Sequence, residues 1–262
     1  MIQTLRAKIR PVLIGLALSA TITLPAQAAG GTAELKDVDW HFSGPFGSFD
    51  KDALRRGLQV YREVCSSCHS LKFVAYRNLG DAGGPALSEA EIKAFAAEYE
   101  VTDGPDSEGD MFERPAEPKD KFVSPFANEQ AARASNNGAL PPDLSLMTKA
   151  RKNGPNHVYS ILTGYQDAPE GVEIGDGMNY NPYFSGGQIA MAQPLFEDQV
   201  EYEDGTPATV EQMSKDVVEF LHWAAEPKLD HRKRLGFKVM IFLIVFAGLL
   251  YAVKRRVWEN LH

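Results

Sequence analysis

The only two cysteines of this 262-residue chain stand three positions apart and are followed at once by a histidine, in Cys65-Ser66-Ser67-Cys68-His69. A disulfide between such close residues closes too short a loop to stabilise a fold. A zinc site needs four ligands, and the chain has no second cysteine pair. A thioredoxin-type redox pair needs a βαβ setting, which the neighbouring sequence does not indicate. Because Cys-x-x-Cys-His is the signature of covalent haem attachment, we predict that Cys65 and Cys68 bind a porphyrin and that His69 binds its iron.

The residues before this segment fit an amphipathic helix that presents both thiols on one face. Asp50 can cap a helix beginning at Lys51. Its apolar stripe recurs at helical spacing and includes both cysteines, through Leu54, Leu58, Tyr61, Cys65 and Cys68. Gly57, in the middle, costs the helix about 1 kcal/mol relative to alanine. We therefore expect another helix to pass close to Gly57.

The second axial ligand of the iron is sought among the seven methionines, because thioether ligation suits electron transfer. Four are set aside: Met1 and Met240 lie in terminal apolar segments, Met213 in the stripe of a helix expected after a capping-box-like Thr209-x-x-Gln212, and Met147 in a short apolar helix. Met111, Met178 and Met191 remain, with Met178 in a turn expected to be exposed. Met191 is favoured, since its small neighbours let the backbone pass close to a flat ring.

The two ends of the chain are expected to direct export and to anchor it. A basic start, a short apolar stretch and Ala26-Gln27-Ala28 make residues 1–28 a predicted signal peptide, the alternative being an uncleaved anchor. Residues 235–253 are apolar enough for a transmembrane helix about 28 Å long, the alternative being a buried core helix. Between them we expect a haem domain at 29–227 and a basic linker at 228–234, with a cytoplasmic tail at 254–262.

Charge is concentrated in the expected haem domain. Residues 29–227 hold 16 Lys and Arg against 33 Asp and Glu, a net charge of −17. A field of this sign repels nucleic acid and steers basic partners, and it equally serves solubility. Acids follow Met191 closely, at Glu197, Asp198, Glu201, Glu203 and Asp204. The stretch from Glu89 to Lys121 is expected to be a surface excursion with a short helix near Ala90–Tyr99.

Several segments in one order resemble the cytochrome c1 family over nearly the whole exported region and the anchor. They are residues 55–61 leading into Cys65–His69, then 73–77, 136–145, 162–165, 179–184, 189–192, 203–209 and 223–227. The resemblance implies a mainly α-helical, cytochrome c-type haem domain with long loops, one covalently attached haem c and one C-terminal transmembrane helix.

The resemblance also assigns site residues. It implies that Met191 is the sixth ligand and that Arg151 contacts a haem propionate, while Pro142 is predicted among the cofactor-binding residues. A propionate-contacting tyrosine of some relatives falls at His157 here. The other histidines, His41, His222, His231 and His262, are expected to be surface or packing residues. No cysteine is left for the extra disulfide of some bacterial relatives.

By the same resemblance, the chain is an electron-transfer subunit of a bc1 complex rather than an enzyme on its own. It would take electrons from a Rieske iron–sulfur protein, beside cytochrome b, and pass them to cytochrome c. Its haem domain would face the periplasm from a bacterial inner membrane. Three alternatives remain: a tethered c-type domain serving a terminal oxidase, a haem peroxidase and a gas sensor. The last two need an open sixth coordination site.

Overall fold

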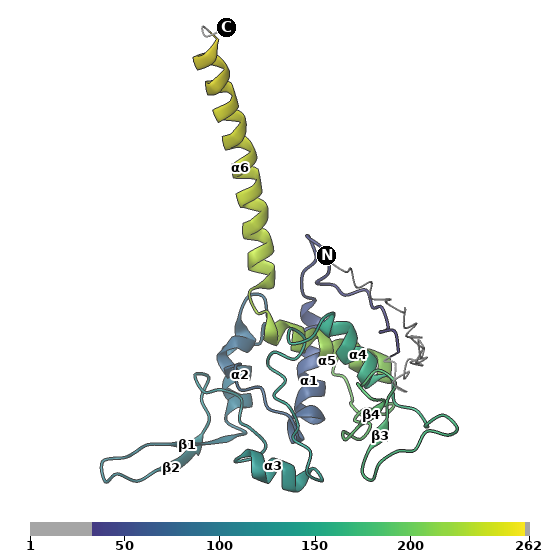
Figure 1. Cartoon of the computed structure of the whole chain (residues 1–262). Helices are drawn as coiled ribbons and strands as arrows, with labels where there is room; N and C mark the ends of the chain where they lie inside the picture. The colour runs from purple at the N-terminus through teal and green to yellow at the C-terminus, as the bar shows by residue number, and fades with distance from the viewer. Residues whose placement is uncertain (1–32, 260–262) are drawn as a thin grey trace, which may run out of the picture.

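Two helices far apart in sequence, α1 (Lys51–Glu63) and α5 (Val210–Ala225), pack against each other at the centre of the computed structural model, which describes residues 33–259 (Figure 1). Asp50 caps α1 as predicted, because its carboxylate accepts from the backbone N–H groups of Asp52 and Ala53 at 2.8 and 3.0 Å. A Cβ atom at Gly57 would lie 2.1 Å from the backbone oxygen of Asp216 on α5. The expected close helix at Gly57 is therefore confirmed.

The mainly α-helical class is confirmed, and strands are few and short within the described residues. Two antiparallel pairs form the only sheets there, β1 with β2 and β3 with β4. The other elements, in chain order, are η1 (Cys65–Ser67), η2 (Tyr76–Gly80), α2 (Glu89–Ala96), β1 (Glu100–Asp103), β2 (Phe112–Pro115), α3 (Glu129–Ser135), α4 (Gly154–Leu162), β3 (Asn179–Tyr180), β4 (Gln188–Ile189) and α6 (Leu229–Trp258).

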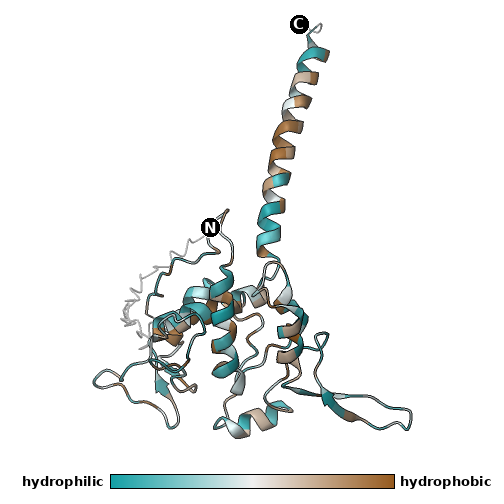
Figure 2. Ribbon diagram, turned by 180° about the vertical axis from the view of Figure 1, so that it is seen from behind, coloured by the Kyte–Doolittle hydropathy of each residue, from teal (hydrophilic) through white to brown (hydrophobic). Residues whose placement is uncertain are grey.

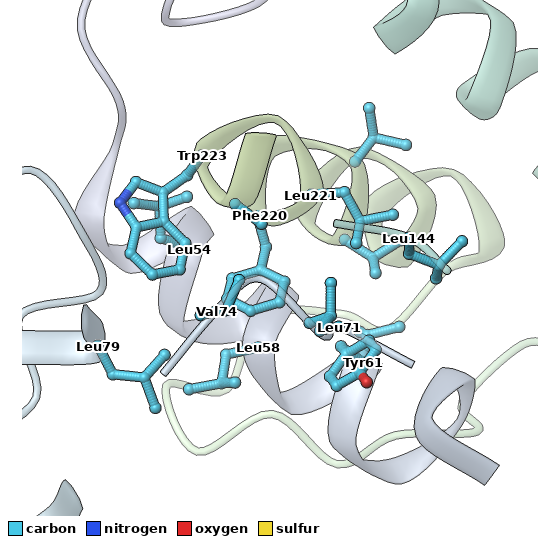
Figure 3. Close-up of a cluster of buried hydrophobic side chains, with 14 of the residues drawn as sticks. Leu54, Leu58, Tyr61, Leu71, Val74, Leu79, Leu144, Phe220, Leu221 and Trp223 are labelled. Carbon is cyan, nitrogen blue, oxygen red and sulfur yellow. The ribbon is translucent and has the colours of Figure 1, made fainter. Parts of the chain in front are cut away.

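The hydrophobic core lies between α1, α5 and the chain that follows the histidine (Figure 3). Tyr61 of α1 packs against Phe220 of α5, with ring centroids 5.9 Å apart, and Phe220 packs against Trp223 at 5.5 Å. Met213 is fully buried, which confirms its assignment to the core. Because both central helices contribute large buried side chains, the core fixes the position of α1 and hence of the cysteine segment that follows it.

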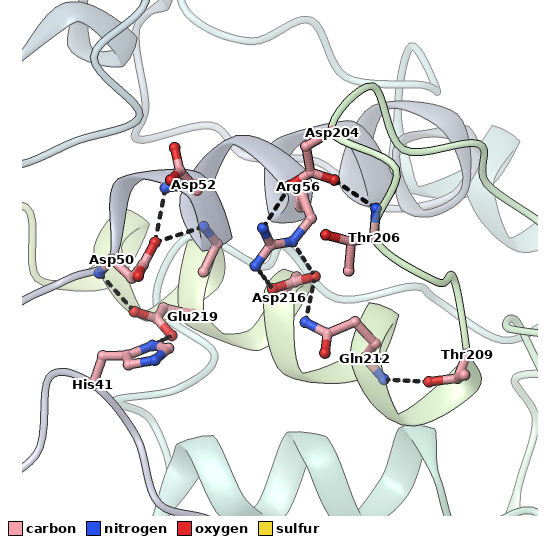
Figure 4. Close-up of polar contacts among 11 residues, drawn as sticks. His41, Asp50, Asp52, Arg56, Asp204, Thr206, Thr209, Gln212, Asp216 and Glu219 are labelled. Carbon is pink, nitrogen blue, oxygen red and sulfur yellow. Dashed lines mark hydrogen bonds and ion pairs between the residues drawn. The ribbon is translucent and has the colours of Figure 1, made fainter.

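A buried ion pair also joins α1 to α5 (Figure 4). The Arg56 guanidinium donates to both carboxylate oxygens of Asp216, at 2.9 and 3.1 Å, and to Asp204 at 2.8 Å. Burial opposes the charge, but these hydrogen bonds raise the pKa of Arg56. Thr209 caps α5 through a 3.1 Å bond from Gln212, whereas the Gln212 side chain bonds Asp216 instead of completing a capping box.

The stretch from Glu89 to Lys121 is more ordered than expected. Its short helix is confirmed as α2, and a β1–β2 hairpin follows that the sequence analysis did not predict. Arg114 of β2 binds Asp103 across the hairpin at 2.5 Å and Asp120 beyond it at 2.7 Å. The hairpin projects from the haem domain on the side away from α6 (Figure 1).

Helix α6 leaves the rest of the molecule as a single long rod with an apolar middle (Figure 2). It is long and apolar enough to cross a membrane, and none of its apolar window is buried within the molecule, unlike a core helix. The expected linker at 228–234 is helical from Leu229 on, since α5 ends at Ala225 and α6 begins at Leu229, with Pro227 between them. The predicted signal peptide and the last residues of the predicted tail lie outside the described residues, and the domain limits remain predictions.

Candidate haem site

The two cysteines follow the C-terminus of α1 in a tighter turn than predicted. The α-helix ends at Glu63, and η1 carries the chain on, so the prediction that both cysteines continue the helical stripe was wrong. Two serine hydroxyls donate hydrogen bonds to backbone oxygens at this end of the helix. Ser66 donates to the oxygen of Arg62 at 2.7 Å, and Ser67 donates to that of Val64 at 2.8 Å. Both thiols are free and half-buried.

The surroundings of these thiols differ from those of a redox dithiol. Redox-active cysteines are deprotonated easily, commonly at a helix N-terminus whose partial positive charge stabilises the thiolate. Here the pair lies at a helix C-terminus. Burial raises the pKa of Cys65 to about 12, and the neighbouring Cys68 raises it further. The Cys65 thiol is therefore kept protonated, which is unsuited to disulfide exchange but compatible with a thioether bond.

His69 is held with one ring nitrogen already occupied. Its Nδ1 lies 2.8 Å from the backbone oxygen of Pro142, and the Tyr61 hydroxyl donates to the backbone oxygen of His69 at 3.0 Å. A carbonyl can only accept, so Nδ1 carries the proton and Nε2 keeps a free lone pair. Burial lowers the pKa of His69 although the bond to Pro142 opposes this, so the ring is neutral, as a metal ligand must be.

The contact of His69 with Pro142 depends on a group of hydrogen bonds around Asp143 that was not predicted from the sequence. Asp143 accepts from the Ser70 hydroxyl at 2.8 Å and from the Lys72 backbone N–H at 2.9 Å. The backbone N–H of Leu144 donates to the oxygen of Ser70 at 2.9 Å. Burial would raise the pKa of Asp143, but these donors, with Ser145, lower it. The segment after His69 is thus fixed against the segment carrying Pro142. Its only sequence signal was the place of Asp143 within the segment 136–145 that carries the family resemblance.

Met191 follows the short β3–β4 pair and packs partly buried against the core. Its backbone oxygen accepts from the Tyr165 hydroxyl at 3.0 Å and from the Asn179 side chain at 3.3 Å. Neither donor was identified from sequence, because each lies far from Met191 along the chain. These bonds fix the backbone from which the thioether extends.

The other methionines are placed differently from Met191. Met111 is 60% exposed, next to the start of β2. Met178 is half-buried, so its expected exposure was wrong, since its turn folds back near Gly175 and Gln188. Met147 packs against the core as expected, but in hydrogen-bonded turns and not in a helix.

Arg151 precedes α4 and lies near His157, which belongs to α4. Arg151 is exposed and makes no hydrogen bond or ion pair within residues 33–259, so its guanidinium is available to an anionic group. Burial lowers the pKa of His157, and the Arg151 cation lowers it further. The propionate contact of Arg151 and the role of His157 remain predictions.

The donor set fits a haem. Two free thiols can form thioethers, a neutral imidazole presents Nε2, and Met191 supplies a thioether. No group of three or more His, Cys, Asp or Glu in the described residues could hold a metal ion. An iron bound by His69 and Met191 would therefore take its remaining ligands from a porphyrin. Within residues 33–259, no hydrogen bond joins Met191 directly to the Cys65–His69 segment.

Comparisons with known proteins find relatives along nearly the whole chain. Residues 40–261 match the model of the Cytochrome C1 family. The chain is 52% identical over 245 residues to "Cytochrome c1 1, heme protein, mitochondrial" of Arabidopsis thaliana, covering 93% of this chain and 78% of the relative. It is 47% identical over 268 residues to cytochrome c1 of Rhodospirillum rubrum, covering 96% and 97%. It is 52% identical to "Cytochrome b/c1" of Bradyrhizobium diazoefficiens, covering 90% of this chain but 37% of that longer protein.

Proposed function

The chain belongs to the cytochrome c1 family, and on that premise we propose that it carries single electrons within a bc1 complex, from a Rieske iron–sulfur protein to a cytochrome c. The observation that carries this proposal is the pairing of two pre-positioned ligands: a neutral His69 anchored on Pro142, and Met191 anchored by Tyr165. Both axial positions would then be filled, which suits electron transfer and leaves no site for a substrate.

The cofactor is haem c, and the proposed residues divide its binding among them. Cys65 and Cys68 would attach it covalently, His69 and Met191 would ligate its iron, and Arg151 would pair with a propionate. When bound, the haem supplies an iron that alternates between the ferrous and ferric states.

The polypeptide contributes rigidity around both ligands. The bond to Pro142 fixes the tautomer and rotation of the His69 ring, which also raises the basicity of Nε2. Two hydrogen bonds fix the backbone of Met191. With both ligands held, little of the chain has to move when the charge of the site changes. This subunit itself makes and breaks no substrate bonds, whereas the whole complex would oxidise quinol.

An acidic surface follows the Met191 segment and is suited to a basic partner. Its carboxylates are all exposed, at Glu197, Asp198, Glu201, Glu203 and Asp204. Asp204 is engaged by Arg56, and Glu197 accepts from the backbone N–H of Val210 at 3.2 Å, which leaves the other three to act on an approaching molecule. Complementary charge raises association rates more than affinity, as a transient electron carrier requires. We assign this surface to docking of a soluble or anchored cytochrome c.

Helix α6 would hold the domain at the membrane in a single span. The domain would face the periplasm of a bacterium, because the predicted signal peptide would export it. In that arrangement cytochrome b lies beside α6, and the Rieske protein and the acceptor approach from the aqueous side.

Co-purification tests the assignment to a bc1 complex. An affinity-tagged copy of the full chain, extracted from its own membranes in mild detergent, should bring down a cytochrome b and a Rieske iron–sulfur protein. Recovery of terminal-oxidase subunits in their place would support the alternative tethered domain and contradict the proposal.

Carbon monoxide separates the proposal from the two alternatives with an open coordination site. Ferrous protein should bind essentially none, because Met191 occupies the position that the gas needs. Ready binding by the intact ferrous protein would favour a peroxidase or a gas sensor. Heat-treated protein, in which the Met191 segment is released, provides the positive control.

A further inference from the structure

One aromatic side chain of the haem domain stands unusually far out of the surface. Phe46 is 82% exposed, more than any other large hydrophobic residue that the structure describes, those of α6 included. It lies in the loop Ser43–Gly47, which contains no charged residue. Its ring is edge-on to that of Phe237 of α6, with centroids 6.0 Å apart.

The loop is held rigidly rather than left free. Its flanks are buried in the core through Phe42 and Phe49, and Phe42 stacks on His222 at 4.2 Å. The Ser48 backbone N–H closes the loop by donating to His41 at 3.0 Å. A Cβ atom at Gly47 would lie 2.0 Å from the oxygen of Ser43, so the closure requires glycine there.

Helix α6 itself fastens this loop. The Lys233 ammonium donates to the backbone oxygens of Phe42 and Gly47, at 2.5 and 3.0 Å. Asp230 accepts from the backbone N–H of Phe49 at 3.4 Å. Both side chains belong to the first turns of α6, just before its apolar stretch. The loop and the base of α6 therefore form one unit, and Phe46 projects beside the helix at the level of Phe237.

Phe237 lies at the edge of the exposed apolar surface of α6. Phe237 lies two residues past Leu235, where the exposed apolar surface of α6 begins, so it sits about 3 Å along the helix from that point. Aromatic side chains favour this boundary, and basic residues favour the headgroup layer beside it. The basic residues at this level are Arg232, Lys233 and Arg234, and the loop beside them is uncharged.

We propose that the Ser43–Gly47 loop is a second membrane contact, in which Phe46 enters the boundary between lipid headgroups and acyl chains and fixes the haem domain against the bilayer. The occupant of this surface is lipid, because Phe46 is continuous with the exposed apolar face of α6 through Phe237 and the loop carries no charged side chain. The inference depends on the proposed membrane span of α6.

Spin labels measure the depth directly. Phe46→Cys, Phe112→Cys on the distant hairpin and Ile244→Cys in the middle of α6 would each be labelled with a nitroxide in the haem-loaded full chain. Vesicles of phosphatidylcholine and phosphatidylglycerol provide the bilayer. The ratio of collisions with oxygen, which concentrates in lipid, to collisions with a water-soluble nickel chelate should be several-fold higher at position 46 than at position 112.

Each other outcome overturns a defined step. A ratio at position 46 equal to that at position 112 would place the loop in water. Low collision rates with both reagents, in the vesicles or in the purified complex, would mean that protein and not lipid covers Phe46. An oxygen preference missing at position 244 would instead overturn the span of α6, and the loop proposal with it.

A substitution of Lys233 tests whether its hydrogen bonds to the loop set the depth of Phe46 in the bilayer. Lys233→Met in the Phe46→Cys background should lower the collision ratio several-fold toward that of Phe112→Cys, while the ratio at position 244 stays the same. An unchanged ratio at position 46 would show that Lys233 does not set the position of the loop.

Discussion

The two sides of the proposed haem site are supported in different ways. The His69 side continues from α1, whose buried face packs on α5 and whose Arg56 pairs with a carboxylate that is 1% exposed. The Met191 side is a loop between a two-residue strand and α5. Two hydrogen bonds fix the Met191 backbone oxygen, Met191 itself is only partly buried, and Leu195 is the next side chain of the loop to enter the core.

The difference indicates how ligand loss should occur. A buried helix pair and a buried ion pair are lost only when the fold opens, whereas a partly buried residue in a loop can detach locally at a smaller cost in free energy. The His69 side should therefore share the stability of the whole domain, and the Met191 side should respond to single contacts in the loop. The variants below test that separation.

The largest effect is expected from Arg56→Ala. Removing the guanidinium leaves Asp216 charged, buried and without its main partner, which should lower the free energy of unfolding by about 3–5 kcal/mol. Denaturant unfolding of the haem-loaded protein measures this. Arg62→Ala on the same helix removes an ion pair with Glu98 in which both side chains are nearly half exposed, and should cost less than about 1 kcal/mol. Equal losses would contradict the assigned role of the buried pair.

Gly57→Ala should be nearly as damaging. The added methyl would meet the Asp216 backbone oxygen and the Phe220 Cβ, so α1 and α5 must separate, at a cost of about 3 kcal/mol or more. Haem content and the thermal midpoint should both fall. Gly236→Ala on α6, where no atom lies within 4 Å of the new Cβ, should leave both unchanged. A stable, fully haem-loaded Gly57→Ala protein would disprove the close packing.

Low pH should destabilise the side of the molecule built from α1 and α5, through His222 of α5. Burial, together with the cations of Lys149 and Lys233, lowers the pKa of His222 from 6.5 to about 4. As the pH falls from 6.5 to 4, the unfolded chain binds a proton there that the folded chain excludes, so stability is lost. The loss should be on the order of 2 kcal/mol.

His222→Gln isolates this effect from that of Glu219. Burial raises the pKa of Glu219, so the folded chain binds a proton there more readily and gains relative stability as the pH falls. The variant should therefore lose stability less steeply than the parent between pH 6.5 and 4, by thermal midpoint. Parallel curves would show that His222 does not contribute.

The smallest change in stability is expected from Tyr165→Phe. Losing one hydrogen bond to Met191 costs about 1 kcal/mol, which corresponds to a roughly five-fold larger population with the loop detached. Carbon monoxide binding to the ferrous protein should rise accordingly. Tyr61→Phe removes the corresponding bond to His69 and should leave gas binding unchanged, because the core holds that side. Equal responses would remove the distinction between the two sides.

Patterns within short stretches of sequence predicted much of this structure. The Asp50 cap, the glycine facing α5, the buried Met213 and the apolar stretch of α6 follow from local spacing, because a helix brings residues three and four apart to one face. The same local pattern failed at Cys65, where serine hydroxyls compete for the last carbonyls and tighten the helix into η1.

The contacts that position the ligands could not be predicted in this way. Pro142 lies 73 residues from His69, and Tyr165 lies 26 residues from Met191. Such bonds exist only once the chain has folded, and nothing in the local sequence of either partner specifies the other. Met191 was favoured by its small neighbours and then assigned, with Arg151, by the family resemblance. Pro142 was predicted among the cofactor-binding residues, and the structure adds reasons for Met191 and Pro142.

The most direct measurement replaces Met191 with leucine in the haem-loaded protein and compares its absorption spectrum and midpoint potential with those of the parent. Met178→Leu, a nearby half-buried methionine, is the matched control. The account predicts that Met191→Leu loses the thioether-ligated spectrum, lowers the potential and binds carbon monoxide when reduced, while Met178→Leu behaves as the parent. A Met191→Leu protein with the parent's spectrum and potential would contradict the axial assignment.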